Sequence, residues 1–166
     1  MLAVVAAASL LVVPVVDAKK NPRSPVKKDA TYRGLTSQGA VCHVDGVDNR
    51  PCTVSLKTSK DGKKVVSMLI RYGAACKDES KYFRSSTRFR GLPITEGKFE
   101  QSAGYGEPIA GGGHAESTVS MHGAFKRKDG RSTVSGDFHV KSKLTFPDDK
   151  PTKCGSGKVT WSARPK

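Results

Sequence analysis

The sequence has little of what marks membrane-spanning chains and motif-bearing enzymes. Beyond its N-terminal apolar run it holds no stretch near the ~20 apolar residues that a spanning helix needs, and no window of sustained helical periodicity. The motifs GxSxG, HExxH and CxxC are absent. Acidic residues are scarce, since 15 Asp and Glu stand against 29 Lys and Arg for a formal net charge of +14. These absences argue against a helical domain, a motif-based hydrolase and a zinc site.

Short runs of Val, Thr and Ser punctuated by Gly, Asp and Pro are typical of an all-β domain. Two Asp-Gly pairs stand between apolar runs, and glycine there favours a tight turn because it adopts positive φ without a Cβ clash. The sequence therefore predicts two hairpins. One covers Thr53 to Cys76 around Asp61-Gly62, and the other covers Val119 to Val140 around Asp129-Gly130.

The alternation of apolar and polar residues predicts the register of each hairpin, because a one-residue slip would exchange the two faces. A two-residue type I′ turn at Asp129-Gly130 pairs apolar with apolar residues on one face and polar with polar on the other. The pairs are Phe125/Val134, Met121/Phe138 and Val119/Val140 inside, and Lys126/Thr133, Ala124/Ser135, His122/Asp137 and Ser120/His139 outside. For the first hairpin, a three-residue Lys60-Asp61-Gly62 loop with Gly62 left-handed pairs Val54 with Met68 and Leu56 with Val66.

The rest of the chain predicts further strands at 31–36, 40–44, 82–90, 94–101 and 158–163. Gly91-Leu92-Pro93 is expected to break the chain between two of these strands. Residues 104–113 are expected to form a Gly-rich loop, and 147–151 a polar loop. In the last strand Val159, Trp161 and Ala163 share one face. The expected fold is an antiparallel β-sandwich or closed β-barrel of about 8–9 strands with two disulfides.

The N-terminus predicts export. Leu2 to Val16 is apolar but too short for a mature transmembrane helix, and small or apolar residues precede a cut after Ala18. The basic start of a usual signal peptide is missing, so either the start is assigned late or the signal is atypical, and an uncleaved anchor is the alternative. The predicted organisation is a signal peptide over 1–18, a basic disordered arm over 19–30 and a single β domain over 31–166.

Four cysteines in an exported chain suggest two disulfides, for which three connectivities exist. We favour Cys42–Cys52, which closes a short loop rich in turn residues, and Cys76–Cys154, which joins a central strand to the last one.

Several short motifs recur in a known family. They are Tyr32-x-Gly34-x-Thr36-Ser37-Gln38-Gly39, Val54-Ser55 and Ser59-x-Asp61-Gly62, Tyr72-x-Ala74-x-Cys76, Phe89-x-Gly91-x-Pro93-Ile94, Gly97-x-Phe99 and Cys154-x-Ser156-Gly157 with Trp161-x-Ala163. With them the chain resembles a family of small, mostly uncharacterised secreted bacterial proteins that is frequent in actinobacteria. The resemblance implies a single β-rich domain and the Cys76–Cys154 pairing, and it transfers no catalytic residue. The Cys42/Cys52 insertion departs from the family pattern.

Basic side chains make the main candidate site. They form two groups, one interleaved with aromatics and one at the second Asp-Gly turn: Arg84, Arg88 and Arg90, and Lys126, Arg127, Lys128 and Arg131. Aligned, they would form a positive strip that binds polyanions in a salt-dependent way. A solvated basic surface that protects sheet edges is the alternative. We expect anionic cell-wall polymers or membrane surfaces as partners of a monomer, without sequence-specific readout of nucleic acid.

Other chemistry has weaker support in the sequence. His122, Asp137 and His139 on the outer face of the second hairpin could serve a small secreted hydrolase, the alternative function. Asp45, Asp48 and Asn49 could gather Ca²⁺, although turn formation already explains them. We expect no metal and no cofactor, and a non-enzymatic extracellular binding module is the leading hypothesis. A secreted inhibitor that presents the Cys42–Cys52 loop is a third possibility.

Overall fold

The computed structural model describes residues 24–39, 51–77, 82–147 and 150–166, and these form eight antiparallel β-strands. The strands are β1 (Thr31–Thr36), β2 (Thr53–Thr58), β3 (Lys64–Cys76), β4 (Tyr82–Pro93), β5 (Lys98–Ile109), β6 (Gly113–Lys128), β7 (Arg131–Thr145) and β8 (Thr152–Pro165). The all-β prediction is confirmed for this part of the chain. Within it, no helix has the length and apolar character needed to cross a membrane.

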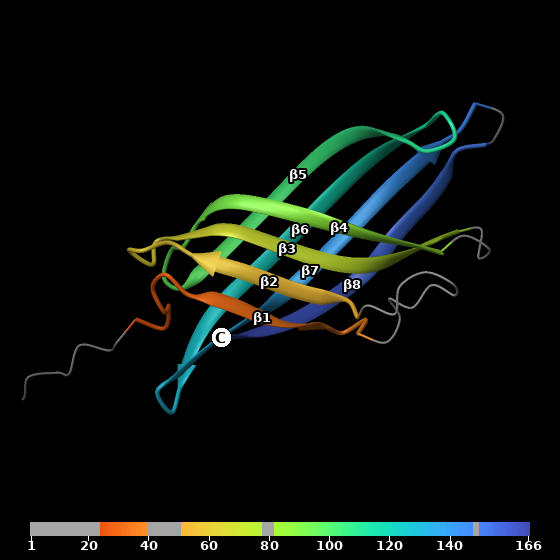
Figure 1. Cartoon of the computed structure of the whole chain (residues 1–166). Helices are drawn as coiled ribbons and strands as arrows, with labels where there is room; N and C mark the ends of the chain where they lie inside the picture. Colours follow the sequence, from red (N-terminus) through yellow and green to blue (C-terminus); the bar gives the residue numbers. More distant parts are fainter. Residues whose placement is uncertain (1–23, 40–50, 78–81, 148–149) are drawn as a thin grey trace, which may run out of the picture.

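The strands form one sheet in the order β4-β3-β2-β1-β8-β7-β6-β5. Figure 1 shows β1 to β4 running obliquely across β5 to β8. Aromatic contacts join these two halves. The ring centroids of Tyr72 on β3 and Phe138 on β7 are 4.9 Å apart, and those of Tyr32 on β1 and Phe125 on β6 are 5.4 Å apart. The two halves of the sheet therefore pack across each other, and their inward faces enclose the core.

The second hairpin has the predicted turn and register. Asp129 and Gly130 both have positive φ, 51° and 76°, as a type I′ turn requires. Phe125 faces Val134, Met121 faces Phe138 and His122 faces Asp137. The inward members of this set are buried, so apolar alternation was sufficient to predict the pairing.

The first hairpin differs from its predicted register by two residues. Val54 pairs with Ile70 and Leu56 with Met68, because the loop is longer than three residues and a bulge follows it between Lys57 and Thr58. Gly62 is left-handed as expected, with φ of 76°. The bulge turns Val66, predicted to be buried opposite Leu56, outward to 47% exposure. Beyond the bulge a two-residue shift keeps each side chain on its face, so alternation there could not reveal it.

Two of the predicted breaks between strands are not at the predicted positions. Gly91 has a φ of 67°, yet β4 continues to Pro93, because Leu92 is buried and pairs with Val65. The chain reverses instead at Glu96-Gly97, where both residues have positive φ and Thr95 bridges Lys98. The predicted strand over 94–101 is therefore wrong in its first half. The expected loop over 104–113 is mostly strand, with β5 running to Ile109 and β6 starting at Gly113.

The segment before β1 contacts the domain. Residues 24–30 belong to the predicted disordered arm, yet Val26 and Ala30 are buried, and the Thr58 hydroxyl donates to the Lys27 carbonyl at 2.8 Å. The Ser132 hydroxyl also bonds to the Pro25 carbonyl. Disorder therefore does not hold for these residues. The signal peptide, the rest of the arm, the strand over 40–44 and the Asp45, Asp48 and Asn49 cluster lie outside the described residues.

The Cys76–Cys154 disulfide is present. The two cysteines are direct partners where the end of β3 pairs with the start of β8, beyond the ends of β1 and β2. Cys42 lies outside the described residues, so the Cys42–Cys52 pairing stays a prediction. The observed bond joins the two halves of the sheet through positions 78 residues apart.

One side chain fills the gap in the sheet beside this junction. The Gln38 amide nitrogen donates to the carbonyls of Gly73 on β3 at 3.0 Å and Ser156 on β8 at 3.1 Å. The Gly73 N–H donates to the Gln38 amide oxygen at 3.2 Å. Gln38 thus takes the place of a strand between β3 and β8. The residues before it, Thr36 and Ser37, hold it there, since the Ser37 N–H donates to the Thr160 carbonyl at 2.7 Å.

Candidate functional site

A groove of about 660 Å³ lies on the outer face of β1 to β4. Each of these strands contributes one cationic side chain to it. They are Arg33 from β1, Lys57 from β2, Arg71 from β3 and Arg88 from β4. Strand alternation places them together, because residues on one face recur at every second position.

The register explains why the surface is hollow. Four paired residues form a row across β1 to β4. Arg33 and Arg88 stand at its two ends, with Ser55 and Leu69 between them. Three strand spacings of about 4.8 Å separate these two arginines. Ser55 and Ser67 are short, so the long basic side chains at the margins stand above the floor between them. The Arg71 guanidinium donates to the Thr53 hydroxyl at 3.4 Å, which holds its head over the same face.

The charge of the groove has one sign. Among the described residues that line it, none is acidic. Lys57 makes an ion pair with Asp29 at 3.6 Å, but both side chains are more than half exposed, and such surface pairs contribute little. A guanidinium offers paired N–H donors that match phosphate, sulfate or carboxylate oxygens. The groove can therefore receive several anionic groups at once.

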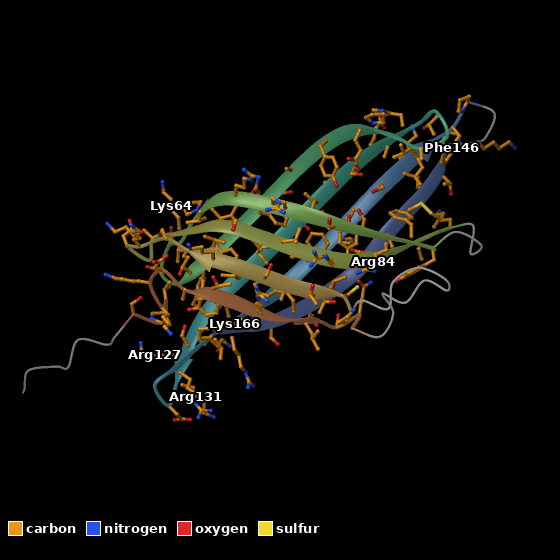
Figure 2. The ribbon with its side chains drawn as sticks, in the orientation of Figure 1. Lys64, Arg84, Arg127, Arg131, Phe146 and Lys166 are labelled. Atoms are coloured by element: carbon orange, nitrogen blue, oxygen red, sulfur yellow. A yellow bond between two sulfur atoms is a disulfide. The ribbon has the colours of Figure 1, made fainter. Side chains whose placement is uncertain are left out.

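The predicted basic residues divide between two places. Arg84, Arg88 and Arg90 share the outer side of β4, and Arg88 lines the groove. The second group, Lys126, Arg127, Lys128 and Arg131, lies at the β6–β7 turn. Figure 2 shows Arg127 and Arg131 at the tip of this hairpin, away from Arg84 on β4. The Arg127 guanidinium donates to the Ser24 carbonyl at 3.3 Å. The structure thus gives two basic clusters where one strip was expected.

Three cations of the groove were missed by sequence reasoning: Arg33, Lys57 and Arg71. They stand on three different strands and form no run, so only the pairing of those strands reveals that they are neighbours. A signal was available in the alternation, because each of them occupies an outward position between buried residues such as Tyr32, Leu56 and Ile70.

The histidine pair lies on the other half of the sheet. His122 Nδ1 is 3.3 Å from Asp137 Oδ2, and His122 Nε2 is 3.6 Å from Glu100 Oε2. Sequence reasoning missed Glu100, which faces His122 from β5. His139 occupies the next row, between Ser120 and Lys158. A groove of about 580 Å³ is lined by Glu100, His122 and Asp137 but not by His139.

This second groove is an open surface. Exposed side-chain fractions are 57% for His122, 78% for Glu100 and 40% for Asp137. In the described segments, no group of three or more His, Cys, Asp or Glu side chains could hold a metal ion. Two carboxylates orient the imidazole, an arrangement that suits proton transfer.

Comparisons with known proteins return no match among family models, curated proteins or solved structures. Function therefore has to be argued from the geometry of the two grooves and from their charge. The resemblance to secreted actinobacterial-type proteins stays a prediction.

Proposed function

We propose that this protein is an exported, non-enzymatic β domain that binds anionic polymers through the basic groove of β1 to β4. The observation that carries the proposal is the gathering of Arg33, Lys57, Arg71 and Arg88 around a floor that includes Ser55, Ser67 and Leu69. None of the described residues that line this groove is acidic. Several cations on a rigid sheet favour a partner with repeated negative charges, because each phosphate that a Lys or Arg neutralises releases a counterion condensed on the polymer.

The expected partner is an anionic cell-wall polymer, with membrane headgroups or another polyanion as alternatives. Export is supported by the Cys76–Cys154 disulfide, since such bonds persist in oxidising compartments, and by the apolar N-terminal run. For the fold we favour a sandwich over a closed barrel. The support is that β4 and β5, the outermost strands in the sheet order, pair with β3 and β6 and not with each other.

Binding to an anionic polymer tests the proposal. We expect fluorescent polyphosphate to bind at 50 mM NaCl and to lose roughly 50-fold in affinity by 200 mM, as four neutralised phosphates on a flexible strand imply. The double variant R71S/R88S should lower affinity roughly tenfold and flatten the salt dependence, since two of the four contacts are gone. Fluorescence anisotropy titrations at four salt concentrations measure both quantities.

The β6–β7 turn supplies the matched control. The variant K128S/R131S removes the same charge from exposed positions outside the groove and should keep the affinity within about twofold. An equal loss in both variants would show that total charge and not the groove binds the polymer. Binding that does not change with salt would contradict the proposal as a whole.

A small secreted hydrolase is the second candidate, favoured by the placing of His122 between Asp137 and Glu100. Our proposal predicts no turnover when the purified chain is assayed with chromogenic ester, phosphodiester and glycoside substrates. Turnover that falls at least a hundredfold in His122→Ala would support the hydrolase instead, because removal of a general base costs about that much. His139→Ala tests whether the histidine of the next row takes part.

A further inference from the structure

A cavity of about 410 Å³ lies between the two halves of the sheet, beside the disulfide. Its walls come from β3 and β4 on one side and from β5, β6 and β7 on the other. Most of them are aromatic or aliphatic: Tyr72, Tyr82, Phe83, Tyr105, Ile109, Ala110, Ala115, Leu144 and Phe146. This size and lining fall in the range of sites that bind small molecules.

The aromatic walls are held in place by the fold. Tyr72 is only 2% exposed and packs on Phe138. The Phe146 ring lies against the β5–β6 turn, and a Cβ on Gly113 would come within 2.7 Å of it. Figure 2 shows Phe146 at the end of the molecule where this turn lies. Gly113 thus leaves room for the ring, and the cavity is built before any ligand arrives.

Access to the cavity runs between the outermost strands. A second pocket of about 310 Å³ lies between β4 and β5, where Thr87 and Gln101 are among its lining residues, and it shares Tyr105 and Glu107 with the cavity. No ladder pairs β4 with β5 in the described part of the chain, so a ligand can enter without breaking backbone hydrogen bonds of the sheet.

The charge of this cavity is opposite to that of the protein. Of the described side chains that line it, Glu107 alone is charged, in a chain of net charge +14. Burial raises the pKa of Tyr72, and the negative charge of Glu107 acts in the same direction. The hydroxyls of Ser117 and Ser142 bond to each other at 2.8 Å, so the polar groups on that wall already have partners.

We propose that the cavity binds a small aromatic amine, with its ring among Tyr72, Tyr105 and Phe146 and its ammonium group at Glu107. Aromatic faces attract cations through their quadrupole, and a carboxylate adds a charge-assisted hydrogen bond. A neutral ring would gain only the apolar contacts, and an anionic one would meet the repulsion of Glu107. The cavity shares no lining residue with the basic groove, so failure of one proposal would leave the other standing.

Three probes of one shape test this proposal on the full chain. We expect 1-naphthylmethylamine to bind at least tenfold more tightly than 1-naphthalenemethanol, and 1-naphthoate to bind most weakly despite the positive protein. Calorimetry gives the affinities, and amide NMR shifts should concentrate at Tyr105, Ala115 and Leu144. Equal binding of amine and alcohol, or shifts confined to other residues, would overturn the proposal.

Substitutions test whether Glu107 binds the ammonium group and whether the ring occupies the cavity. Glu107→Gln, at an exposed position, should cost the amine about tenfold and erase its advantage over the alcohol. Glu116→Gln removes the same charge from β6 outside the cavity and should leave the affinities unchanged. Ser142→Phe should fill the cavity and weaken all three probes, with the melting temperature as a check on folding. R33S/R71S changes two groove residues that line neither the cavity nor its entrance pocket, and it should bind the amine normally. An unchanged affinity in Glu107→Gln would contradict the assignment.

Discussion

Replacing Cys76 and Cys154 together by alanine is expected to lower the free energy of unfolding by about 4.5 kcal/mol. The bond closes a loop with a sequence separation of 78 residues, and the chain-entropy relation assigns that cost to the freedom regained by the unfolded chain. Because the cysteines are partners where β3 meets β8, their loss also frees the end of the cavity wall. Urea unfolding followed by tryptophan fluorescence measures the change.

The other predicted cystine gives the comparison for this result. Alanine at Cys42 and Cys52 opens a loop of ten residues by sequence, for which the same relation gives about 2.7 kcal/mol. The Cys76/Cys154 variant should therefore unfold at the lower urea concentration. Two results would show that loop closure does not govern stability here. One is a lower urea midpoint for the Cys42/Cys52 variant, and the other is a decrease of less than about 1 kcal/mol in the unfolding free energy of the Cys76/Cys154 variant.

Gln38→Ala is expected to lower the free energy of unfolding by about 2–4 kcal/mol, which is a large loss for a side chain that is only half-buried. The substitution removes three hydrogen bonds at once and leaves the N–H and carbonyl of Gly73 and the carbonyl of Ser156 without the partners they have now. Gly73 and Ser156 are buried, so unpaired groups there pay the desolvation cost. Thermal and urea denaturation measure the loss.

Gln101→Ala is the matched control for this prediction. Gln101 is also half-buried, but its side-chain oxygen has no hydrogen-bond partner in the described part of the chain, so its truncation should cost under about 1 kcal/mol. Gln38→Glu tests the donor function of the side chain separately from its acceptor function. The carboxylate can still accept from the Gly73 N–H, but its second oxygen would repel the carbonyls of Gly73 and Ser156. It should be at least as unstable as Gln38→Ala. Similar losses for Gln38→Ala and Gln101→Ala would remove the special role of Gln38.

The hairpins show what alternation can and cannot predict. At Asp129-Gly130 the turn type, the register and the inward face all follow from the order of apolar residues, and all are observed. At Asp61-Gly62 a bulge turned Val66 outward and moved the register by two residues, while the residues beyond it kept their faces, so the pattern there carried no information about the shift. Gly91-Leu92-Pro93 was expected to end a strand, but β4 continues to Pro93 because Leu92 is buried, although Gly91 has a positive φ.

The candidate site was harder to predict than the fold. Arg88 was recognised because it belongs to a run of basic and aromatic residues on one strand. Arg33, Lys57 and Arg71 were not, because their proximity depends on the order of strands in the sheet, which local sequence does not encode. The same holds for Glu100 beside His122. Tyr32-x-Gly34-x-Thr36-Ser37-Gln38-Gly39 was noticed as a motif, and the structure supplies a physical reason for it in the bonds of Gln38.

The position of β1 has a consequence for how the chain acquires its structure. β1 lies between β2 and β8, so Tyr32 is paired with Pro165 close to the C-terminus. A nascent chain that lacks β8 leaves β1 and β7 each without one neighbour, and such long-range pairing is slow to form. The sheet therefore cannot be completed until β8 has been made, and the pairing of β1 and β7 with it is a late step of folding.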